Sequence, residues 1–264
     1  MIADRYTIGP ELQRGAFGVI YKGMYEKKGE PVAIKMESAK ISTLQHEVKM
    51  IQYLFMSGVR NIPCIYWFGT YLENPCVVIT LFECSLYEYK MSGKEITTDK
   101  MNKIMWKLLD IFEHVHKYFV VHRDIKPHNF MIKNGELYLI DFGLATFYIN
   151  ENGQHYPDTG GTTMIGSPQF ASIRIHQGHR YSRRDDLISL GYLWRYMMGT
   201  FWSSSAKSNL SLLDLQHPMN LELQCQKENI ADENHYMKYV YSLEYDETPK
   251  YEPLKMMFIY SSPV

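Results

Sequence analysis

His122-Arg123-Asp124-Ile125-Lys126-Pro127-His128-Asn129 is followed, after a short apolar stretch, by Asp141-Phe142-Gly143. The stretch between them, residues 130–140, has two apolar runs joined by Asn134-Gly135, which predicts a β-hairpin with a two-residue turn. A hairpin brings its two ends together, so Asn129 and Asp141 are expected to lie on neighbouring loops. Their side-chain oxygen atoms suit a hard cation such as Mg²⁺, which makes both residues candidate metal ligands.

Asp124 and Lys126 come one loop earlier in the chain. There the carboxylate can receive the proton of a hydroxyl group, and the ammonium can neutralise charge on a transferring group. A positioned base, metal ligands and a cation are the parts that phosphoryl transfer requires. An isolated Asp-Phe-Gly occurs in ordinary turns, but the whole string with its hairpin is far more specific. The pattern therefore predicts a phosphoryl-transfer site.

The composition is that of a globular protein that does not depend on overall charge for recognition. The 264 residues are 45% hydrophobic and 22% charged, which allows one large domain or two small lobes with a sizeable core. The formal net charge of −1 gives no general attraction to nucleic acid or to anionic membranes. We expect a monomer with no nucleic-acid partner and no membrane partner.

The four cysteines are widely spaced and form no pair with metal-ligand spacing; they are Cys64, Cys76, Cys84 and Cys225. So few cysteines in a chain of this length do not form a disulfide scaffold, and buried free thiols are the expectation. No apolar run is long enough to span a bilayer, and the first residues lack the apolar core of a signal peptide. These features favour a cytoplasmic or nuclear location.

Residues 6–36 alternate short apolar segments with glycines and charges, as in an antiparallel sheet. Gly15 and Gly18 fall at a turn between two of the expected strands, where backbone N–H groups can approach phosphate oxygens. On its own this pattern also fits an ordinary β-turn. Gln13 stands where the first glycine of such a loop is usual.

A lysine on the next expected strand and a glutamate on the next expected helix are candidate partners. Lys35 shares a strand face with Ala33, and the helix is expected to open at Ser42 with Gln45 completing a capping box. Glu47 falls on the apolar stripe of this helix, where an unpaired charge would cost several kcal/mol. We predict an ion pair between Lys35 and Glu47; the alternatives are a solvated lysine and a glutamate that reaches the surface.

The chain then divides into a small β-rich lobe, about residues 1–81, a link at about 82–85, and a larger helical lobe, about 86–264. Backbone groups of such a link can hydrogen-bond a nucleobase. A helix starting at Thr97 carries a clean apolar stripe up to position 115, and the tail between Met237 and Phe258 predicts two more helical pieces. His114 and His116 have no ligand spacing and are expected to be structural.

Residues 144–170 are irregular, and long irregular segments inside compact domains are usually functional, here as a shelf for a peptide. Arg183 and Arg184 form a cationic fork suited to an anionic substrate group, with a salt bridge to a nearby acid as the alternative. Asp186 is expected to fix the backbone of the His122 loop. The run from Leu187 to Met198 predicts a buried helix.

The sequence resembles the eukaryotic protein kinase family, and most closely casein kinase I, over essentially the whole chain. Three stretches carry the closer resemblance. Residues 62–69 are similar to the segment after the first helix of that family, Ala171-Ser172-Ile173 stands where most protein kinases have Ala-Pro-Glu, and residues 182–191 look like its hallmark helix entry.

The resemblance implies an α+β, bilobal fold and a Ser/Thr protein kinase that uses MgATP and acts on protein substrates. Asp124 would be the catalytic base, Lys126 would steady the γ-phosphate with Ser167 nearby, and Asn129 and Asp141 would hold Mg²⁺. Lys35, oriented by Glu47, would bind the α- and β-phosphates. The other residues that the resemblance assigns to ATP are Leu12, Gln13, Gly15, Gly18 and Ile20 of the phosphate loop, Ile79 as gatekeeper, Leu81 in the link, and Ala33, Met131 and Ile140 as apolar walls.

The sequence also departs from the casein kinase I pattern. Gln13 replaces a glycine, and Gln169 stands where a basic residue is expected in the substrate shelf. We predict a weaker preference for pre-phosphorylated or acidic substrates than is usual for that family. The main alternative to an active kinase is a pseudokinase that binds ATP or acts as a scaffold; a small-molecule phosphotransferase of related fold fits the Asp141-Phe142-Gly143 motif less well.

Overall fold

The computed structural model describes residues 1–15, 18–39, 42–199 and 231–259. The chain forms two compact units: unit 1 comprises Met1–Ser85 with Met131–Leu144, and unit 2 comprises Leu86–Phe130 with Ala145–Val264. Cys225 lies outside the described residues. Among the helices of these ranges, none combines the length and the apolar character that crossing a lipid bilayer requires.

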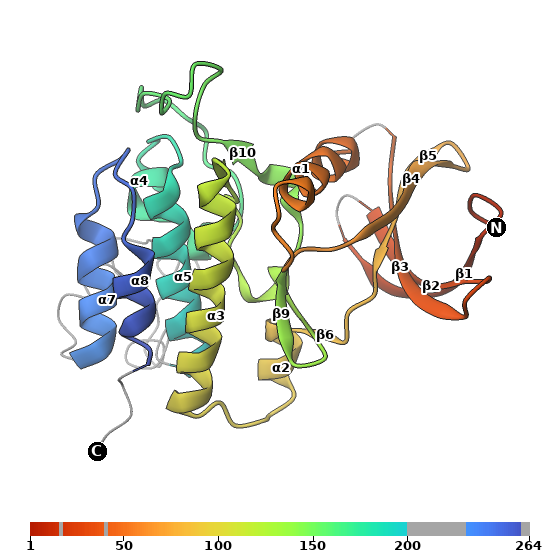
Figure 1. Ribbon diagram of the computed structural model, residues 1–264, viewed down its shortest axis with the longest axis horizontal. Coiled ribbons are helices and arrows are strands. Elements are labelled where there is room, and N and C mark those ends of the chain that lie inside the picture. The colour runs from red at the N-terminus through yellow and green to blue at the C-terminus, as the bar shows by residue number, and fades with distance from the viewer. Residues whose placement is uncertain (16–17, 40–41, 200–230, 260–264) are drawn as a thin grey trace, which may run out of the picture. The chain divides into compact units, whose positions relative to one another are not determined.

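Unit 1 is built on a five-stranded antiparallel sheet with the strand order β1-β2-β3-β5-β4, which confirms the sheet predicted from residues 6–36 (Figure 1). The strands are β1 (Tyr6–Arg14), β2 (Gly18–Tyr25), β3 (Glu30–Glu37), β4 (Ile65–Tyr71) and β5 (Asn74–Thr80). One face carries a core that includes Val32 and Ile34. The opposite face receives helix α1 (Leu44–Met56) through Leu44, Val48 and Val77.

The start of α1 differs from the prediction. The helix begins at Leu44, the N-cap residue Thr43 makes no capping bond with its side chain, and Gln45 is exposed. The predicted capping box of Ser42 and Gln45 is therefore wrong. The reason is tertiary: the Ser42 hydroxyl and the Thr43 backbone N–H both donate to Glu37 on β3.

A second sheet in unit 1 has the order β6-β8-β9, from β6 (Cys84–Ser85), β8 (Phe130–Lys133) and β9 (Glu136–Leu139). Asn134 and Gly135 between β8 and β9 have positive φ values of 52° and 76°, as a type I′ turn requires, so the predicted hairpin is confirmed. Asn61 donates to Leu137 O and accepts from Leu139 N, each at 2.9 Å. These bonds place the hairpin in unit 1. The lobe boundaries expected from the sequence put residues 130–140 in the second lobe, about residues 86–264.

Unit 2 is mainly helical. Its helices are α2 (Leu86–Met91), α3 (Thr98–Lys117), α4 (Ile173–His176), α5 (Arg183–Met198), α7 (Ala231–Ser242) and α8 (Tyr251–Met256), with short strands β7 (Val120–Val121) and β10 (Thr146–Phe147). Helix α5 contacts both α3 and α7, and α8 packs against α3 (Figure 1). The predicted helices after Thr97 and over Leu187–Met198, and the two helical pieces of the tail, are confirmed.

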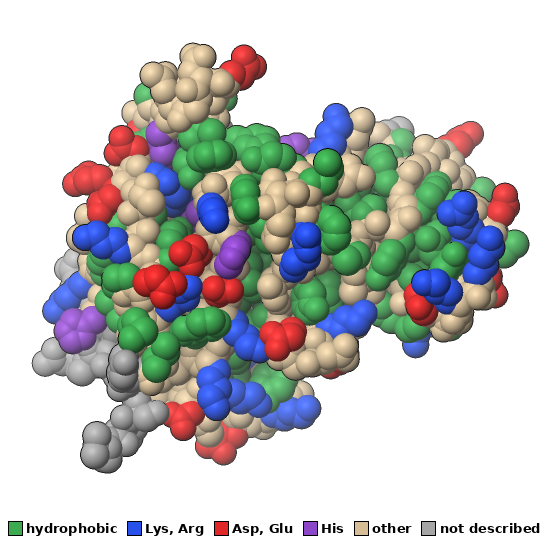
Figure 2. Space-filling model, viewed as in Figure 1, with side chains coloured by type: hydrophobic (Ala, Val, Ile, Leu, Met, Phe, Trp, Pro, Cys, Tyr) green, Lys and Arg blue, Asp and Glu red, His purple; other side chains and the backbone are tan. Residues whose placement is uncertain are grey.

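Helix α5 is buried along almost its whole length, and Ser182 and Asp185 form a capping box at its start. A helix that is buried on all sides needs few polar positions, which explains the mainly apolar run from Leu187 to Met198 after its charged first turn. The β-rich unit 1 and the helical unit 2 confirm the predicted fold class. Figure 2 shows basic and acidic side chains interspersed on the visible face, in keeping with the net charge of −1.

Candidate active site

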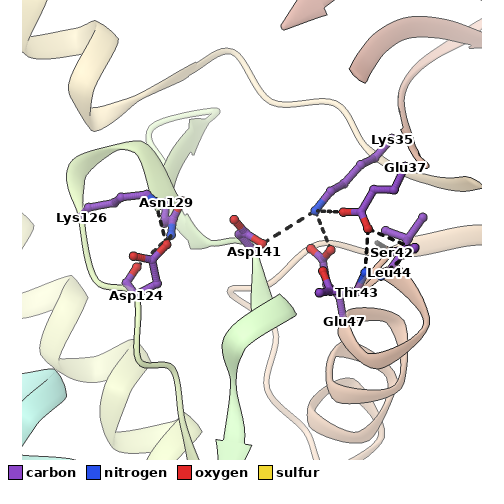
Figure 3. A network of polar contacts seen from close by, with 10 residues as sticks. All are labelled: Lys35, Glu37, Ser42, Thr43, Leu44, Glu47, Asp124, Lys126, Asn129 and Asp141. Atoms are coloured by element: carbon purple, nitrogen blue, oxygen red, sulfur yellow. Dashed lines mark hydrogen bonds and ion pairs between the residues drawn. The ribbon is translucent and has the colours of Figure 1, made fainter. Parts of the chain in front are cut away.

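The first polar cluster lies in unit 1 around Lys35 on β3 (Figure 3). Lys35 Nζ lies 2.7 Å from Glu47 Oε2, 3.3 Å from Glu37 Oε1 and 3.7 Å from Asp141 Oδ1. The predicted ion pair between Lys35 and Glu47 is confirmed, and its catalytic role stays a prediction. Sequence reasoning missed Glu37; the available signal was its position two residues after Lys35, on the same strand face.

This cluster holds one ammonium group among three carboxylates. Burial by itself lowers the pKa of Lys35, but the charges of Glu47, Asp141 and Glu37 outweigh it and raise that pKa. Burial raises the pKa of Glu47, and the nearby charges of Asp141 and Glu37 add to this while Lys35 opposes it. The ammonium is therefore firmly held as a cation, and the carboxylates around it carry surplus negative charge.

The predicted nucleotide-contacting residues of the large sheet share the face that carries Lys35. Lys35 pairs across the strands with Ile20 on β2, and Ala33 pairs with Ile79 on β5. Directly opposed residues project to the same side of a sheet, so Ile20, Ala33, Lys35 and Ile79 line one surface. On β1, Gln13 pairs with Ile20, and Leu12 lies at an irregularity of the strand with 50% of its surface exposed.

The remaining predicted ATP-binding residues also belong to unit 1. Gly15 donates its N–H to the carbonyl oxygen of Gly18 over 2.9 Å, which closes the turn between β1 and β2. Leu81, Met131 and Ile140 are half-buried in the link and the hairpin. The apolar and phosphate-loop residues assigned to ATP thus lie within the same compact unit as Lys35.

Asp141 ends the hairpin in an uncommon backbone conformation. Its φ is 65°, in the left-handed region that non-glycine residues seldom adopt, and its carboxylate is 43% exposed. Phe142 is fully buried. A Cβ placed on Gly143 would lie 3.0 Å from Thr43 Oγ1, so this segment packs directly on the start of α1.

The second polar cluster lies in unit 2 and surrounds Asp124 (Figure 3). Lys126 Nζ and Asn129 Nδ2 donate to Asp124 Oδ2 over 2.6 and 3.0 Å, and Asn129 Nδ2 also donates to Asp124 O over 2.8 Å. Lys126 Nζ also donates to Ser167 Oγ over 3.1 Å, which bears out the expected closeness of Ser167. The cluster therefore fixes one oxygen of the carboxylate and leaves the other for a further contact.

That other oxygen, Asp124 Oδ1, is buried and receives no hydrogen bond from any described residue. Burial alone would raise the pKa of Asp124, but the hydrogen bond and charge of Lys126, together with Ser167, lower it overall. The carboxylate is thus ionised at neutral pH and has a free acceptor atom. A buried acceptor without a donor costs free energy, and such groups are typical of functional sites.

Asp186 at the start of α5 holds the loop that carries Asp124. It accepts the backbone N–H groups of His122 and Arg123 over 2.7 and 3.0 Å, which confirms its predicted role. Arg123 has a φ of 69°. Because both carboxylate oxygens bind backbone donors, the strained conformation of this loop is held by the protein interior.

His116 extends this anchor to the last helix. Its Nε2–H donates to Asp186 Oδ2 over 3.0 Å, so its Nδ1 accepts from the Tyr251 hydroxyl of α8. The structural role predicted for His116 is confirmed, but sequence reasoning missed its link to the Asp124 loop. The signal was absent because α3, α5 and α8 lie far apart in the chain.

Arg183 and Arg184, predicted to bind a substrate anion, are buried in unit 2. Arg183 donates to the Tyr148 hydroxyl, Thr248 Oγ1 and Asp246 O, and Arg184 donates to Leu243 O. These internal bonds favour a structural role for both guanidinium groups. We therefore assign no substrate-anion role to Arg183 and Arg184.

The donor atoms that the two clusters offer suit Mg²⁺. Both hydrogen bonds of Asn129 given above use Nδ2, which leaves its amide oxygen for a ligand. Asp141 offers a partly exposed carboxylate. Hard oxygen donors of this kind are the ones that Mg²⁺ prefers. Asn129 belongs to unit 2 and Asp141 to unit 1, so their predicted closeness stays a prediction.

The family comparison agrees with this arrangement of side chains. A family model described as the protein kinase domain matches residues 6–245. The match includes every residue that the sequence assigned to catalysis, metal binding and ATP binding, and it extends over both units. The chain therefore belongs to the protein kinase domain family.

Proposed function

We propose that this chain is an ATP-dependent Ser/Thr protein kinase, similar to casein kinase I, that transfers the γ-phosphate of MgATP to protein hydroxyl groups. The observation that carries the proposal is the state of Asp124: an ionised carboxylate with Oδ2 held by Lys126 and Asn129 and with Oδ1 free to accept. A general base needs this combination of fixed position and open lone pair.

In the proposed reaction, the substrate hydroxyl donates its proton to Asp124 Oδ1 as its oxygen bonds to the γ-phosphorus. The bond between that phosphorus and the β,γ-bridging oxygen breaks, and ADP carries the electron pair away. Lys126 offsets the negative charge of the transferring group while it keeps Oδ2 in place. Mg²⁺, held by Asn129 and Asp141, would neutralise phosphate charge when bound.

The nucleotide is assigned to the residues of unit 1. Lys35, oriented by Glu47, binds the α- and β-phosphates, and its firmly held positive charge supports this role. Ile79 is the gatekeeper and Leu81 contacts the adenine. The apolar walls and the phosphate loop are formed by Ala33, Met131 and Ile140 and by Leu12, Gln13, Gly15, Gly18 and Ile20.

Radiolabelled ATP and casein test the proposal in the presence of Mg²⁺. Transfer by the unaltered chain should fall by about 100-fold or more in Asp124→Asn and in Asp141→Asn. Asp99→Asn, which changes an exposed residue in the first turn of α3, is the matched control and should transfer normally. Equal rates in Asp124→Asn and the unaltered chain would refute the role of Asp124.

A pseudokinase that binds ATP without turnover is the second candidate, and Gln13 in the phosphate loop is the feature that favours it. The same experiment separates the two functions when nucleotide affinity is measured beside transfer. A pseudokinase would bind MgATP with loss of affinity in Lys35→Met, yet it would label no casein at any enzyme concentration.

We also propose a weak preference for pre-phosphorylated substrates, because Gln169 supplies no positive charge in the substrate shelf. One peptide in primed and unprimed forms should give similar kcat/KM values, and a strong primed preference would contradict this. A monomeric chain in the cytoplasm or nucleus completes the proposal; the free thiols of Cys64 and Cys76 fit a reducing compartment.

A further inference from the structure

Glu37, at the end of β3, is the most deeply buried of the three carboxylates around Lys35. Only 2% of its surface is exposed. A carboxylate in such a place must be paired and hydrogen-bonded, because an isolated buried charge is far too costly. Its two oxygen atoms have different partners, so the residue joins two parts of unit 1.

Oε1 of Glu37 faces the ammonium of Lys35 at 3.3 Å. Oε2 accepts the backbone N–H of Thr43 over 2.9 Å and the hydroxyl of Ser42 over 3.0 Å. Ser42 Oγ in turn accepts the backbone N–H of Leu44 over 3.2 Å. The first residues of α1 are thus fastened to β3 by one carboxylate (Figure 3).

Helix α1 depends on this connection because its N-cap residue makes no side-chain cap, and Ser42, which accepts the N–H of Leu44, is itself held by Glu37. The Thr43 side chain makes no capping bond, and the first N–H groups of a helix otherwise need an acceptor. A negative charge at this end also interacts favourably with the helix dipole. Glu37 therefore accepts the N–H of the N-cap residue and positions the Ser42 hydroxyl that accepts the N–H of Leu44.

The position of the α1 start controls two contacts. Glu47, whose N–H donates to Thr43 O over 3.0 Å, reaches Lys35 from the first turn of α1. Thr43 also packs against Gly143, two residues after Asp141. A shift of the helix start would therefore move Glu47 relative to Lys35, and it would move Thr43 relative to the segment that carries Asp141.

We propose that Glu37 is a positioning residue that sets the Lys35–Glu47 pair, with one oxygen on the ammonium and the other on the start of α1. Its importance for phosphoryl transfer rests on the proposed function. Its role as an anchor of α1 does not, so the two can be tested separately.

The first test measures hydrogen exchange of the backbone amides in the nucleotide-free chain. Glu37→Gln keeps the size of the side chain, but its amide nitrogen must face donors, because Lys35, Ser42 and Thr43 all donate to this residue. Exchange in the first turn of α1 should become about tenfold faster, in line with the loss of a helix cap. Unchanged exchange there would overturn the proposal.

Glu30→Gln is the matched control for this test. Glu30 is an exposed residue at the other end of β3, and its nearest basic partner, Lys28 Nζ, is 4.0 Å away. Exchange in α1 should not change in this variant, and exchange in α3 and α5 should not change in either variant. Faster exchange throughout the chain in Glu37→Gln would indicate general destabilisation and would also overturn the proposal.

The second test asks whether Glu37 acts through Lys35. Glu37→Gln should lower kcat/KM for ATP by about tenfold in the unaltered background. In the Lys35→Met background it should cause almost no further loss, because coupled residues are not additive. Additive losses would show that Glu37 does not work through the ammonium.

Glu37→Asp adds a rescue arm to the same comparison. The shorter side chain keeps the charge and should recover part of the exchange protection and part of the kcat/KM, whereas Glu37→Ala should recover neither. A chain that fails to label any protein would refute the proposed function only. The exchange comparison would still decide whether Glu37 anchors α1.

Discussion

Lys35 in unit 1 is surrounded by charged side chains, whereas the loop that carries Asp124 in unit 2 is held through its backbone. The first cluster contains one ammonium and the carboxylates of Glu37, Glu47 and Asp141. In the second, Asp186 accepts two backbone N–H groups and the imidazole of His116. Charge balance therefore governs the first arrangement, and directional hydrogen bonds govern the second.

Both regions include a residue with left-handed backbone, a conformation that costs about 1–2 kcal/mol outside glycine. In unit 2 this residue is Arg123, and its own N–H is one of the groups bound by Asp186. In unit 1 it is Asp141, whose carboxylate lies 3.7 Å from the ammonium of Lys35. Unit 2 thus holds its strained loop by short bonds, and unit 1 holds its strained residue by a longer electrostatic contact.

The largest effect is expected from Asp186→Asn. The new amide nitrogen must face one of three donors, and the buried charge that binds them is lost. We expect the free energy of unfolding to fall by about 3–5 kcal/mol, the usual cost of breaking a buried charged network. Urea unfolding measures this change, with Asp99→Asn as the exposed control. A loss below about 1 kcal/mol would contradict the anchoring role.

Gly166→Ala should have the next largest effect, and it tests the fit around Asp124. The φ of Gly166 is 81°, and an added Cβ would lie 2.3 Å from Arg123 O and 3.3 Å from Asp124 Oδ1. Overpacking of this kind costs about 1–3 kcal/mol, in addition to the strain of about 1–2 kcal/mol at positive φ. Because the added methyl group must displace the loop that carries Asp124, the rate of casein phosphorylation should fall by a larger factor than the loss of folding stability alone would cause.

Gly160→Ala is the matched control, because Gly160 has a similar φ of 67° but no atom within 4 Å of an added Cβ. It shares the backbone strain of Gly166→Ala and lacks the clash. Activity and stability are measured for both variants by casein labelling and urea unfolding. Similar activity losses in the two variants would show that backbone strain alone, and not contact with Asp124, explains the effect.

Glu47→Gln should cost much less stability than Asp186→Asn. Lys35 keeps Glu37 and Asp141 as partners, and the surplus of negative charge in the cluster decreases. We expect the free energy of unfolding to change by about 1 kcal/mol or less, while the nucleotide affinity falls. Urea unfolding and ATP titration give the two values. A loss as large as that of Asp186→Asn would remove the distinction between the clusters.

The features that the sequence predicted correctly depend on local patterns. The turn at Asn134 and Gly135 needs two residues of positive φ. Asn and Gly adopt positive φ readily, so the turn can be recognised from these adjacent residues alone. The burial of Glu47 follows from its place on an apolar stripe of one helix. The role of Asp186 was predicted from its position directly before the apolar run Leu187–Met198.

The features that the sequence did not predict depend on contacts between distant elements. Ser42 and Gln45 have the pattern of a capping box, but Glu37 on a neighbouring strand competes for the same donors. Arg183 resembles a surface cation in the sequence, yet its guanidinium group is buried and donates to two distant segments, to Tyr148 in one and to Asp246 and Thr248 in the other. A local sequence pattern does not determine which acceptor, distant in the chain, a side-chain donor will bind in the folded protein.

The two clusters should also respond in opposite directions to mild acidification, which is the smallest effect predicted here. Burial lowers the pKa of His116 below its usual 6.5, with Asp186 opposing and Arg183 adding to the shift. The unfolded chain then binds the proton more readily than the folded chain. The contribution of His116 to stability is therefore complete above pH 6.5 and is lost as the pH falls from 6.5 towards the folded pKa.

Glu47 has the opposite sign, because burial and the neighbouring carboxylates raise its pKa above the usual 4.5. The folded chain binds this proton more readily, so stability from Glu47 increases as the pH falls through its folded pKa towards 4.5. Hydrogen exchange, corrected for the intrinsic effect of pH, can follow α1 and α3 separately. Each group changes the local opening free energy by at most about 1.4 kcal/mol per pH unit.

Between pH 7 and 5, α3 should therefore lose protection and α1 should keep or gain it, and Glu47→Gln should abolish the gain in α1 only. If both helices lost protection together, unit 1 would not be carrying the surplus negative charge that its contacts indicate. If the protection of neither helix changed, the pKa of His116 would have to be the same in the folded and the unfolded chain, which would contradict the predicted effect of its burial. The contrast between a charge-governed and a bond-governed cluster predicts divergence, because only the first can relieve repulsion by taking up a proton.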